Sequence, residues 1–596
     1  MTHDDLLRLI EQCLRQARQA VDPQLQGIRW RRLEDAEVSR LESCGNSSPD
    51  WTGVAVSGRA ALEAAVDCRF EGTVRLDIVS GSLLRSSTIR DCDLSGLVSV
   101  DRVGMLRGFL VEDGARILFC HSVSHAAGSR AGTGVPLELG CETGERRLRA
   151  VPTLRVDLAE ALTSGRIEPG VRAAYEAGVD DLASFVEGMT KGRIGRNSSI
   201  TCTALVDSVF LGEECSIEAA CSVRDCIMLG GSGEGSRIAD GSIVTGSALQ
   251  WGATVQGHAS VSDSIVGERA LVERGARLSG SLLGPDCSQG CGEIAASLIG
   301  PLVAAHHESL LVAVRWPGGC GNVGYGANMG SNHTSRLPDQ EASVGSGVFL
   351  GLGCSVKFPI SLERAPGTVI ATGVVVPPQR LEFPFSLVTG PSSAGPGLEP
   401  GMLEIRPGWV IYGNLFALLR NLRKYEERRK ASRSPAPEGP AGASALGMVL
   451  EARGRLRRAE GREHYTADQI PGIGACFMTE RSRLRGIEGY DLFTAWILLR
   501  DFVRRLGPGP GSAEAVTTDL GHEFPGRSPG ELLAIYGTTL KEMSAKVLES
   551  RSRDFERGSS IIDDYSSAHL SPGTDPVLRE ILRALDEEAR SAASLQ

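Results

Sequence analysis

The middle of the chain repeats one small polar residue followed by two or three aliphatic residues and, usually, a glycine. Copies of this pattern begin at Ser208, Cys226, Ser264, Ser281 and Ser297, and a weaker copy begins at Ser247. The steps between the stronger copies are 18, 38, 17 and 16 residues, and the weaker copy divides the 38 into 21 and 17. Three hexapeptides make one turn of a triangular β-solenoid, which fits this spacing. Because each repeat buries its apolar edge only against the next, the pattern predicts a mainly β solenoid.

The repeat and its interruptions divide the chain into six predicted segments. An N-terminal helical cap covers residues 1–57, and the first β-helix coils cover 58–128. Apolar residues at helical spacing, such as Leu158, Leu162 and Val171, predict a helical insertion over 129–193. The remaining segments are the main β-helix at 194–392, a helix and linker at 393–446, and a large C-terminal helical domain at 447–596.

The distribution of charge limits the partners that the chain is expected to have. It carries 63 basic and 73 acidic residues, mixed along the sequence, and its net charge is −10. Nucleic acids bind concentrated basic surfaces, so we do not expect them as the main partner. The first twenty residues lack the apolar core of a signal peptide, and no run of 18 apolar residues occurs. We therefore expect a cytoplasmic chain without a membrane-spanning helix.

Two further features are interpreted as structural. The 15 cysteines include no CxxC pair, and several occupy repeat positions: Cys202, Cys215, Cys221, Cys226, Cys287 and Cys291. We expect them to be small buried hydrophobic residues. A predicted helix at 402–430 ends in a basic turn, which we interpret as cations that face water at a helix C-terminus: Arg420, Arg423, Lys424, Arg428, Arg429 and Lys430.

The stretch from His306 to Phe358 departs most from the repeat. It contains three of the chain's ten histidines, His306, His307 and His333. Polar residues accompany them: Asn322, Asn328, Asn332, Arg336, Asp339 and Glu341. A loop of this composition on a rigid coil suits a general base. The spacing of the histidines does not match that of zinc ligands, so no metal site is predicted.

The coils resemble the left-handed parallel β-helix of hexapeptide-repeat acyltransferases. The segment Asn322–His333 is similar to the NIGAGTITCNY stretch in the acetyltransferase half of bacterial N-acetylglucosamine-1-phosphate uridylyltransferases. His307-Glu308-Ser309-Leu310 stands where that family has HLSY, whose histidine is the catalytic base. Val344–Gly351 resembles the IGDDVFVG coil that follows. The pyrophosphorylase half of those enzymes has no counterpart here.

Two other resemblances involve the same region. His333, followed by a segment rich in Pro, Asp and Glu and by Val375-Val376-Pro377-Pro378, is similar to the maltose and galactoside O-acetyltransferases, in which a loop histidine is the base. The whole chain also looks like a bacterial family labelled as UDP-N-acetylglucosamine pyrophosphorylase-related. The matching residues there are Asn332-His333-Thr334, Pro338–Glu341, Gly408-Trp409-Val410 and Lys424-Tyr425.

These resemblances imply acyl transfer from acetyl-CoA, as a co-substrate rather than a tightly bound cofactor, to a sugar, sugar phosphate or nucleotide sugar. His333 or His307 would be the catalytic base, because neutral imidazole can accept the proton of an attacking hydroxyl or amine. The implied substrate-binding residues are Asn332, Arg336, Asp339, Glu341, Asn328 and Tyr325, and the implied acetyl-CoA-binding residues are Lys357, Gly351 and Ala371. Acyltransferases of this kind form sites between neighbouring chains, so a homo-oligomer, with a trimer favoured, is expected.

Two alternatives stay open. The first is a non-catalytic solenoid scaffold or metabolite-binding assembly protein, which the long helical C-terminal region favours. The second is a protein related to sugar-phosphate nucleotidyltransferases, although the glycine-rich nucleotide loop of those enzymes does not occur in this sequence.

Overall fold

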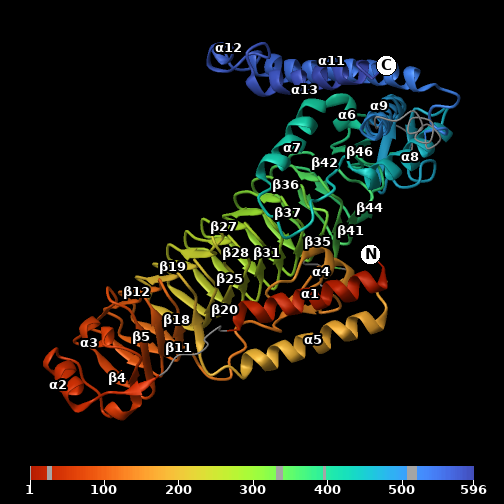
Figure 1. The fold of residues 1–596 in the computed structure, drawn as a ribbon. Coiled ribbons are helices and arrows are strands. Elements are labelled where there is room, and N and C mark those ends of the chain that lie inside the picture. The colour runs from red at the N-terminus through yellow and green to blue at the C-terminus, as the bar shows by residue number, and fades with distance from the viewer. Residues whose placement is uncertain (1, 23–29, 331–339, 394–397, 507–519, 596) are drawn as a thin grey trace. The chain divides into compact units, whose positions relative to one another are not determined.

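The computed structural model describes residues 2–22, 30–330, 340–393, 398–506 and 520–595. The chain forms a parallel β-solenoid of about 19 turns, accompanied by helices (Figure 1). The predicted β-solenoid fold is therefore confirmed. The residues fall into two compact units: unit 1 is Met1–Pro317, Asn328–Glu341 and Lys430–Pro435, and unit 2 is Gly318–Ala327, Ala342–Arg429 and Ala436–Gln596.

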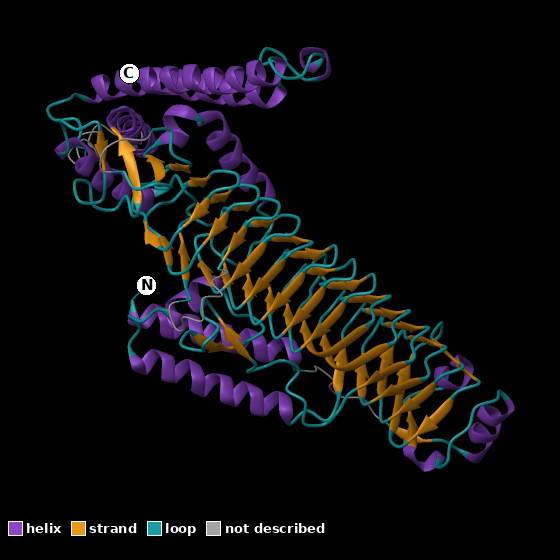
Figure 2. Cartoon of the chain, turned by 180° about the vertical axis from the view of Figure 1, so that it is seen from behind, coloured by secondary structure: helices purple, strands orange, loops and turns teal. Residues whose placement is uncertain are grey.

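Successive turns of unit 1 stack in parallel register, and Figure 2 shows the resulting ladder of strands. Ile243 pairs with Ser260, Ser260 with Arg277, Arg277 with Glu293 and Glu293 with Leu310, so these turns are 17, 17, 16 and 17 residues long. This length matches the spacing of the sequence pattern. The strands of this face are β22 (Ile243–Thr245), β25 (Ser260–Ser262), β28 (Arg277–Ser279), β31 (Glu293–Ala295) and β34 (Leu310–Val312).

A column of buried serines explains the small polar residue of the pattern. Ser281 precedes β29 (Leu282–Leu283) and is fully buried. Its Oγ donates a hydrogen bond to the carbonyl of Ser279 (2.7 Å) and accepts one from the N–H of Ser297 in the next turn (2.9 Å). Ser264 and Ser297 repeat both contacts, accepting from the N–H groups of Ser281 and Val314. Each hydroxyl thus satisfies buried backbone groups of two turns.

The two aliphatic residues after each serine are both buried because both faces of these strands are covered. Side chains alternate along a strand, so only one of the pair can point into the solenoid. Leu282 belongs to a core shared with the N-terminal helix and the insertion, whereas Leu283 is buried outside that core, inside the solenoid. Ala248, Ile265 and Leu298 occupy the position of Leu282 in neighbouring turns. The apolar pair therefore marks a covered outer face.

Glycine ends the pattern because the corner of the turn has no space for a side chain. A Cβ on Gly284 would lie 2.7 Å from the carbonyl oxygen of Ile299 in the next turn. A Cβ on Gly300 would lie 2.2 Å from the carbonyl oxygen of Pro317. Backbone atoms at these distances cannot move aside without breaking the stacking of the turns.

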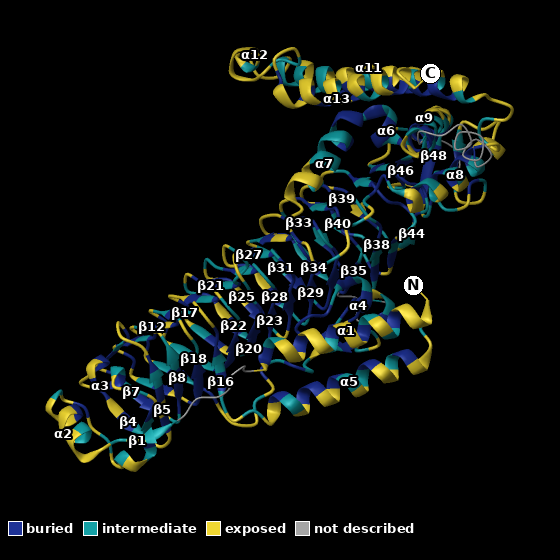
Figure 3. Ribbon diagram, in the orientation of Figure 1, coloured by how far each residue is buried: buried dark blue, intermediate teal, exposed yellow. Residues whose placement is uncertain are grey.

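The layer on the outer face of unit 1 consists of α1 (His3–Val21), α4 (Val156–Thr163) and α5 (Pro169–Glu187). Leu6 and Ile10 of α1 share one apolar core with Tyr175 and Val179 of α5 and with the outward leucines of the strands. Figure 3 shows α1 and α5 with one buried and one exposed side. An amphipathic helix needs such a partner to bury its apolar stripe.

The insertion leaves and rejoins the solenoid in register. β11 (Phe109–Val111) pairs in parallel with β16 (Gly192–Ile194), so the turns on either side of the insertion are neighbours. The predicted 1–57 segment is divided in space: α1 lies against α5, while α2 (Asp35–Ser43) lies by the first strands with α3 (Ala60–Ala64) (Figure 1). The two described helices of this segment, α1 and α2, therefore contact different parts of unit 1.

Unit 2 contains further parallel turns followed by helices. β36 (Asn322–Val323), β39 (Phe349–Leu350), β42 (Val369–Ile370) and β45 (Leu387–Thr389) stack in this order. β46 (Leu403–Arg406) then pairs antiparallel with β45, which ends this parallel ladder. The helices among its described residues are α6 (Trp409–Gly413), α7 (Leu415–Arg428), α8 (Ala443–Arg458), α9 (Glu480–Arg505), α11 (Pro529–Ser559), α12 (Tyr565–Ala568) and α13 (Pro576–Ala593).

The cysteines follow the expectation of burial only in part. Cys215, Cys226 and Cys287 are buried, and burial raises the pKa of Cys226 to about 12. Cys202, Cys221 and Cys291 are exposed instead. Cys202 and Cys291 have a φ of 50°, which places them at corners of the solenoid rather than on its inward strand positions.

The helices among the described residues include none that is both long and apolar enough to cross a membrane.

The serine column is tested by Ser281→Ala. This change removes the acceptor for the N–H of Ser297 and leaves that buried group unsatisfied. We expect a loss of about 1–3 kcal/mol in the free energy of unfolding, measured from urea denaturation. Ser288→Ala, on the exposed side of β30 (Ser288–Gly290), is the control and should change it by less than about 0.5 kcal/mol. Equal small effects of both changes would show that the column does not stabilise the stacking.

Candidate functional site

Four of the predicted site residues, His333, Asn332, Arg336 and Asp339, lie outside the described residues, in the range 331–339. The role of His333 as a catalytic base therefore stays a prediction.

His307 lies on an exposed turn between β33 (Ala304–Ala305) and β34. The hydroxyl of Ser309 donates a hydrogen bond to the carbonyl of His306 (2.7 Å), and the N–H of Glu308 donates to the carbonyl of Cys291 in the preceding turn. These bonds fix the backbone of the turn while the imidazole of His307 stays open to solvent. An imidazole in this position can reach a substrate proton, as a general base must.

Glu341 and Asn328, which were predicted to bind substrate, have different surroundings. Both carboxylate oxygens of Glu341 accept hydrogen bonds from Arg146, at 2.7 and 2.8 Å, so Glu341 anchors the insertion. Asn328 belongs to β37 (Asn328–Met329) and pairs with Leu310. Its side-chain oxygen is buried and accepts no hydrogen bond from the described residues.

The other predicted residues lie in unit 2, along its turns. Tyr325 is half exposed at a corner, where its carbonyl accepts a hydrogen bond from the N–H of Gly353 (2.8 Å). Gly351 and Ala371 occupy equivalent positions in successive turns, donating to the carbonyls of Ile370 and Val388.

The predicted acetyl-CoA-binding residues have backbone roles in these turns. A Cβ on Gly351 would lie 2.5 Å from the carbonyl oxygen of Ile370, so the stacking of turns alone requires glycine there. Lys357 follows the next strand, β40 (Ser355–Val356), and its N–H donates to the carbonyl of Val376 (2.9 Å).

A cavity of about 510 Å³ lies among the helices of unit 2. This volume is within the range of small-molecule sites in proteins. α7 supplies one wall, and residues of α11, α12 and α13 or the segments before them supply the rest. The lining contains four cations, three carboxylates and two aromatic rings: Phe416, Arg420, Arg423, Lys424, Glu427, Arg551, Asp554, Tyr565, Asp575 and Val577.

Two of the four cations are neutralised by carboxylates. Arg551 contacts Asp575 (2.8 Å) and also donates to the carbonyl of Leu570 (3.2 Å). Arg423 contacts Glu427 (2.7 Å) and Glu580 of α13 (2.5 Å). These ion pairs hold the cavity walls together, because they join α7 to α13 and α11 to the residue that caps α13.

The other two cations, Arg420 and Lys424, have no carboxylate partner in the described part of the chain. The Nε of Arg420 is buried without a hydrogen-bond partner, and its Nη2 donates only a long bond to Asn421 (3.5 Å). The guanidinium lies 5.9 Å from the centre of the Phe416 ring. A buried donor without a partner is costly, so the guanidinium of Arg420 would gain from a further hydrogen-bond partner.

Arg420 and Lys424 reinforce each other's positive potential. They are four residues apart on α7, which places them on one side of the helix. Partial desolvation lowers the pKa of Lys424, and the charges of Arg420 and Arg428 lower it further, while the charge of Glu427 opposes the shift. Like charges at this spacing destabilise a helix by about 0.2–0.5 kcal/mol, so a bound anion would relieve the repulsion.

The sequence contained a signal for this cavity in the basic turn of α7. The interpretation that its cations face water holds for Lys424, Arg428 and Arg429, which are exposed, but Arg420 and Arg423 are only half exposed. Arg420, Arg423 and Lys424 line the cavity. The opposite wall comes from a distant part of the sequence, and no local pattern connects the two.

A family model described as a domain of unknown function (DUF4954) matches residues 30–347. The chain belongs to the DUF4954 family. The match includes His307 and the insertion of unit 1 but not the cavity of unit 2. A protein of Treponema pallidum (strain Nichols), described as an uncharacterized protein, is 24% identical over 426 residues, which cover 67% of this chain and 57% of the relative. The chain thus spans about 57% of the length of that curated relative.

The repulsion in the cavity predicts how Lys424 titrates. The charge on Lys424 is disfavoured in the folded chain, and this cost disappears as the pH rises through its lowered pKa. We expect Lys424 to titrate below the ordinary pKa of a lysine, measured by NMR of ¹³C-methylated lysines. Arg420→Gln removes one repelling charge and should raise the pKa of Lys424. A pKa that does not change in this variant would contradict the electrostatic description of the cavity.

Proposed function

We propose that this protein binds a small phosphate-bearing metabolite in the cavity of unit 2. The observation that carries the proposal is the pair Arg420 and Lys424, two cations in a cavity without carboxylate partners in the described part of the chain. In this function the solenoid is a scaffold that supports a ligand-binding helical unit.

The chemistry of the lining favours phosphate over other anions. A guanidinium forms two parallel hydrogen bonds to phosphate oxygens, and a lysine adds a point charge. Phe416 and Tyr565 provide rings against which a base or another planar group can pack. Glu427 and Asp554 can accept hydrogen bonds from ligand hydroxyls. The ligand class is therefore a phosphorylated compound with a ring and hydroxyl groups.

This ligand class includes the compounds that the family resemblance implies. Nucleotide sugars, sugar phosphates and acetyl-CoA all carry phosphates together with hydroxyl groups and a sugar or nucleotide ring. The left-handed hexapeptide-repeat β-helix, a cytoplasmic location and a homo-trimer belong to the same proposal, and the resemblance to hexapeptide-repeat acyltransferases supports them.

Isothermal titration calorimetry of the intact chain tests the proposal. The probes are inorganic pyrophosphate, coenzyme A and UDP-N-acetylglucosamine. We expect at least one to bind, and Arg420→Gln and Lys424→Gln each to weaken that binding about tenfold or more, because a charge-assisted hydrogen bond is lost.

The matched control is Arg429→Gln, an exposed cation just beyond α7 that does not line the cavity. Binding to the control should equal that of the wild type. Failure of all three probes to bind, or equal losses in the control and the cavity variants, would refute the proposal.

A second candidate function is acyl transfer with His307 as the base. The observation that favours it is the exposed imidazole on a rigid turn of the solenoid, in the segment that resembles the HLSY motif. Asn328 lies in the next turn, and its buried side-chain oxygen accepts no hydrogen bond from the described residues.

Acyl transfer is tested by following the release of coenzyme A from acetyl-CoA with sugar phosphates or UDP-N-acetylglucosamine as acceptors. We expect His307→Ala to lower turnover by about 10²–10⁴-fold, since general-base catalysis contributes that much. His258, another exposed histidine of unit 1, supplies the control His258→Ala, which should keep the wild-type rate. Equal rates for the wild type and His307→Ala would exclude His307 as the base.

A further inference from the structure

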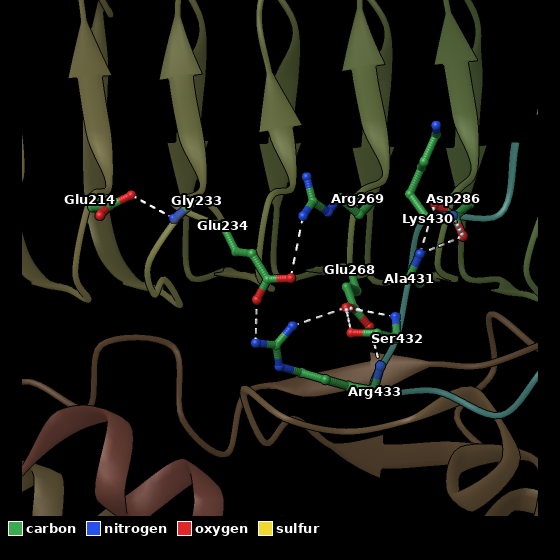
Figure 4. A network of polar contacts seen from close by, with 10 residues as sticks. All are labelled: Glu214, Gly233, Glu234, Glu268, Arg269, Asp286, Lys430, Ala431, Ser432 and Arg433. Carbon is green, nitrogen blue, oxygen red and sulfur yellow. Dashed lines mark hydrogen bonds and ion pairs between the residues drawn. The ribbon is translucent and has the colours of Figure 1, made fainter.

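The segment Lys430–Pro435, here called the strap, belongs to unit 1, although the chain before and after it belongs to unit 2. It lies along one edge of the solenoid, where its backbone contacts the corners of two adjacent turns (Figure 4). Carboxylates from corners of the solenoid hold it: Glu234, Glu268 and Asp286, here called the acidic corner row.

The acidic corner row binds the backbone of the strap. Asp286 accepts hydrogen bonds from the N–H groups of Lys430 (3.0 Å) and Ala431 (3.0 Å). Glu268 accepts from the N–H groups of Ser432 (3.0 Å) and Arg433 (3.0 Å). Four consecutive amides are thus bound by two carboxylates, so the strap is held in one register.

Arg433 adds a side-chain anchor. Its guanidinium contacts Glu268 (3.0 Å) and Glu234, and it stacks over the ring of Trp251 at 4.4 Å. Arg269 also contacts Glu234 (3.3 Å). Charge-assisted contacts of this kind are the stronger class of hydrogen bonds.

The stacking of the turns brings the three carboxylates of the acidic corner row to one edge of the solenoid. The N–H of Asp286 donates to the carbonyl of Glu268, so these two corners belong to adjacent turns. The N–H of Gly252 donates to the carbonyl of Glu234, and the N–H of Arg269 to the carbonyl of Trp251, so Glu234 lies two turns before Glu268. The side chain of Glu268 is only 2% exposed. A buried carboxylate is tolerated only when donors surround it, and the strap supplies four of them.

The electrostatic balance at this edge is sensitive to added negative charge. Burial raises the pKa of Asp286, and the nearby charge of Glu268 adds to the increase, although the amides of the strap oppose it. The contact with Arg433 lowers the pKa of Glu234. Arg433 of the strap thus forms ion pairs with two of the three carboxylates, while Asp286 is held by backbone amides.

Ser432 is the residue of the strap whose hydroxyl lies beside the buried carboxylate of Glu268. Its hydroxyl is 3.4 Å from Oε1 of Glu268, and the residue is exposed to solvent. Arg429 and Lys430 lie three and two residues before it, a basic context that many serine kinases select. A group attached to this hydroxyl would lie directly against the buried carboxylate.

We propose that Ser432 is a phosphorylation site and that a phosphoryl group on its hydroxyl releases the strap from the acidic corner row. In the modification, the Ser432 Oγ attacks the γ-phosphorus of a nucleoside triphosphate on a serine kinase. The new O–P bond forms as the bond to the leaving nucleoside diphosphate breaks, and the hydroxyl proton goes to the kinase's base. The added charge of about −1.5 to −2 then repels Glu268.

Hydrogen–deuterium exchange of the intact chain tests the electrostatic part. In Ser432→Glu we expect the amides of residues 430–433 to exchange about tenfold faster or more, because their carboxylate acceptors are lost when the strap is released. Ser432→Gln, similar in size and neutral, should keep the wild-type protection. Peptides from the neighbouring turns report whether the solenoid stays folded in each variant.

Two results would overturn the proposal. Wild-type protection in Ser432→Glu would show that negative charge does not release the strap. Equal loss in Ser432→Glu and Ser432→Gln would show that size, not charge, is responsible. Glu268→Gln provides a second measurement: it removes the repelling charge, so the double variant Ser432→Glu/Glu268→Gln should regain part of the protection that Ser432→Glu loses, and no regain would also contradict the proposal.

The modification itself is tested with a serine kinase that prefers arginine three residues before the serine. The intact chain is incubated with this kinase and ATP, and its peptides are mapped by mass spectrometry. We expect phosphate on Ser432, and faster exchange of the strap in the phosphorylated chain. No phosphate on Ser432 under conditions in which a free peptide of residues 427–437 is fully modified would overturn its assignment as a phosphorylation site.

Discussion

Each turn of the solenoid can bury its apolar residues only by stacking on the next turn, and the other features of unit 1 depend on this stacking. The serine column fixes the register, because the Oγ atoms of Ser247, Ser264 and Ser281 each accept the N–H of the serine one turn later. The glycine corners permit the turns to approach, since a Cβ on Gly284 would meet the backbone of the following turn. Stability, register and the position of every corner residue therefore have one physical origin.

The fixed register turns corner residues into ordered rows. Side chains that are far apart in the sequence become neighbours at the distance of one turn, as with Glu268 and Asp286. A row of carboxylates can then bind four consecutive amides of an extended segment, which a single acidic residue cannot do. On its outer face the same solenoid binds helices through a continuous apolar surface. The scaffold thus offers different chemistry on its faces and its corners.

The fold could be predicted from the sequence because its cause is local and repeated. The four residues Ser281-Leu282-Leu283-Gly284 contain the hydroxyl that bonds to the next turn, the leucine that points into the solenoid and the glycine at a corner without space for a side chain. The pair of leucines also signalled a covered outer face, although the sequence alone did not identify α1 and α5 as the cover. That assignment depends on tertiary packing. The pattern of an amphipathic helix shows that one side is buried but does not identify the surface that buries it.

The candidate sites could not be predicted as well, because each joins distant segments. Glu341 looked like a substrate ligand, yet its partner Arg146 is 195 residues away. The strap contacts Asp286 across 144 residues, and its sequence resembles an ordinary polar linker. Arg420 and Lys424 stood in a recognisable basic run, but α11, α12 and α13 are needed to form a cavity around them. Charge patterns locate such residues without revealing what faces them.

The location of a bound anion tests the proposed function of unit 2 most directly. Tungstate is a heavy oxyanion that resembles phosphate, and its anomalous scattering identifies its position in crystals of the intact chain. We expect a tungstate peak within hydrogen-bond distance of Arg420 and Lys424, and loss of that peak in crystals of Arg420→Gln. An empty cavity together with a peak beside the His306–Glu308 turn would contradict the proposed anion site and place the chemistry on the solenoid instead.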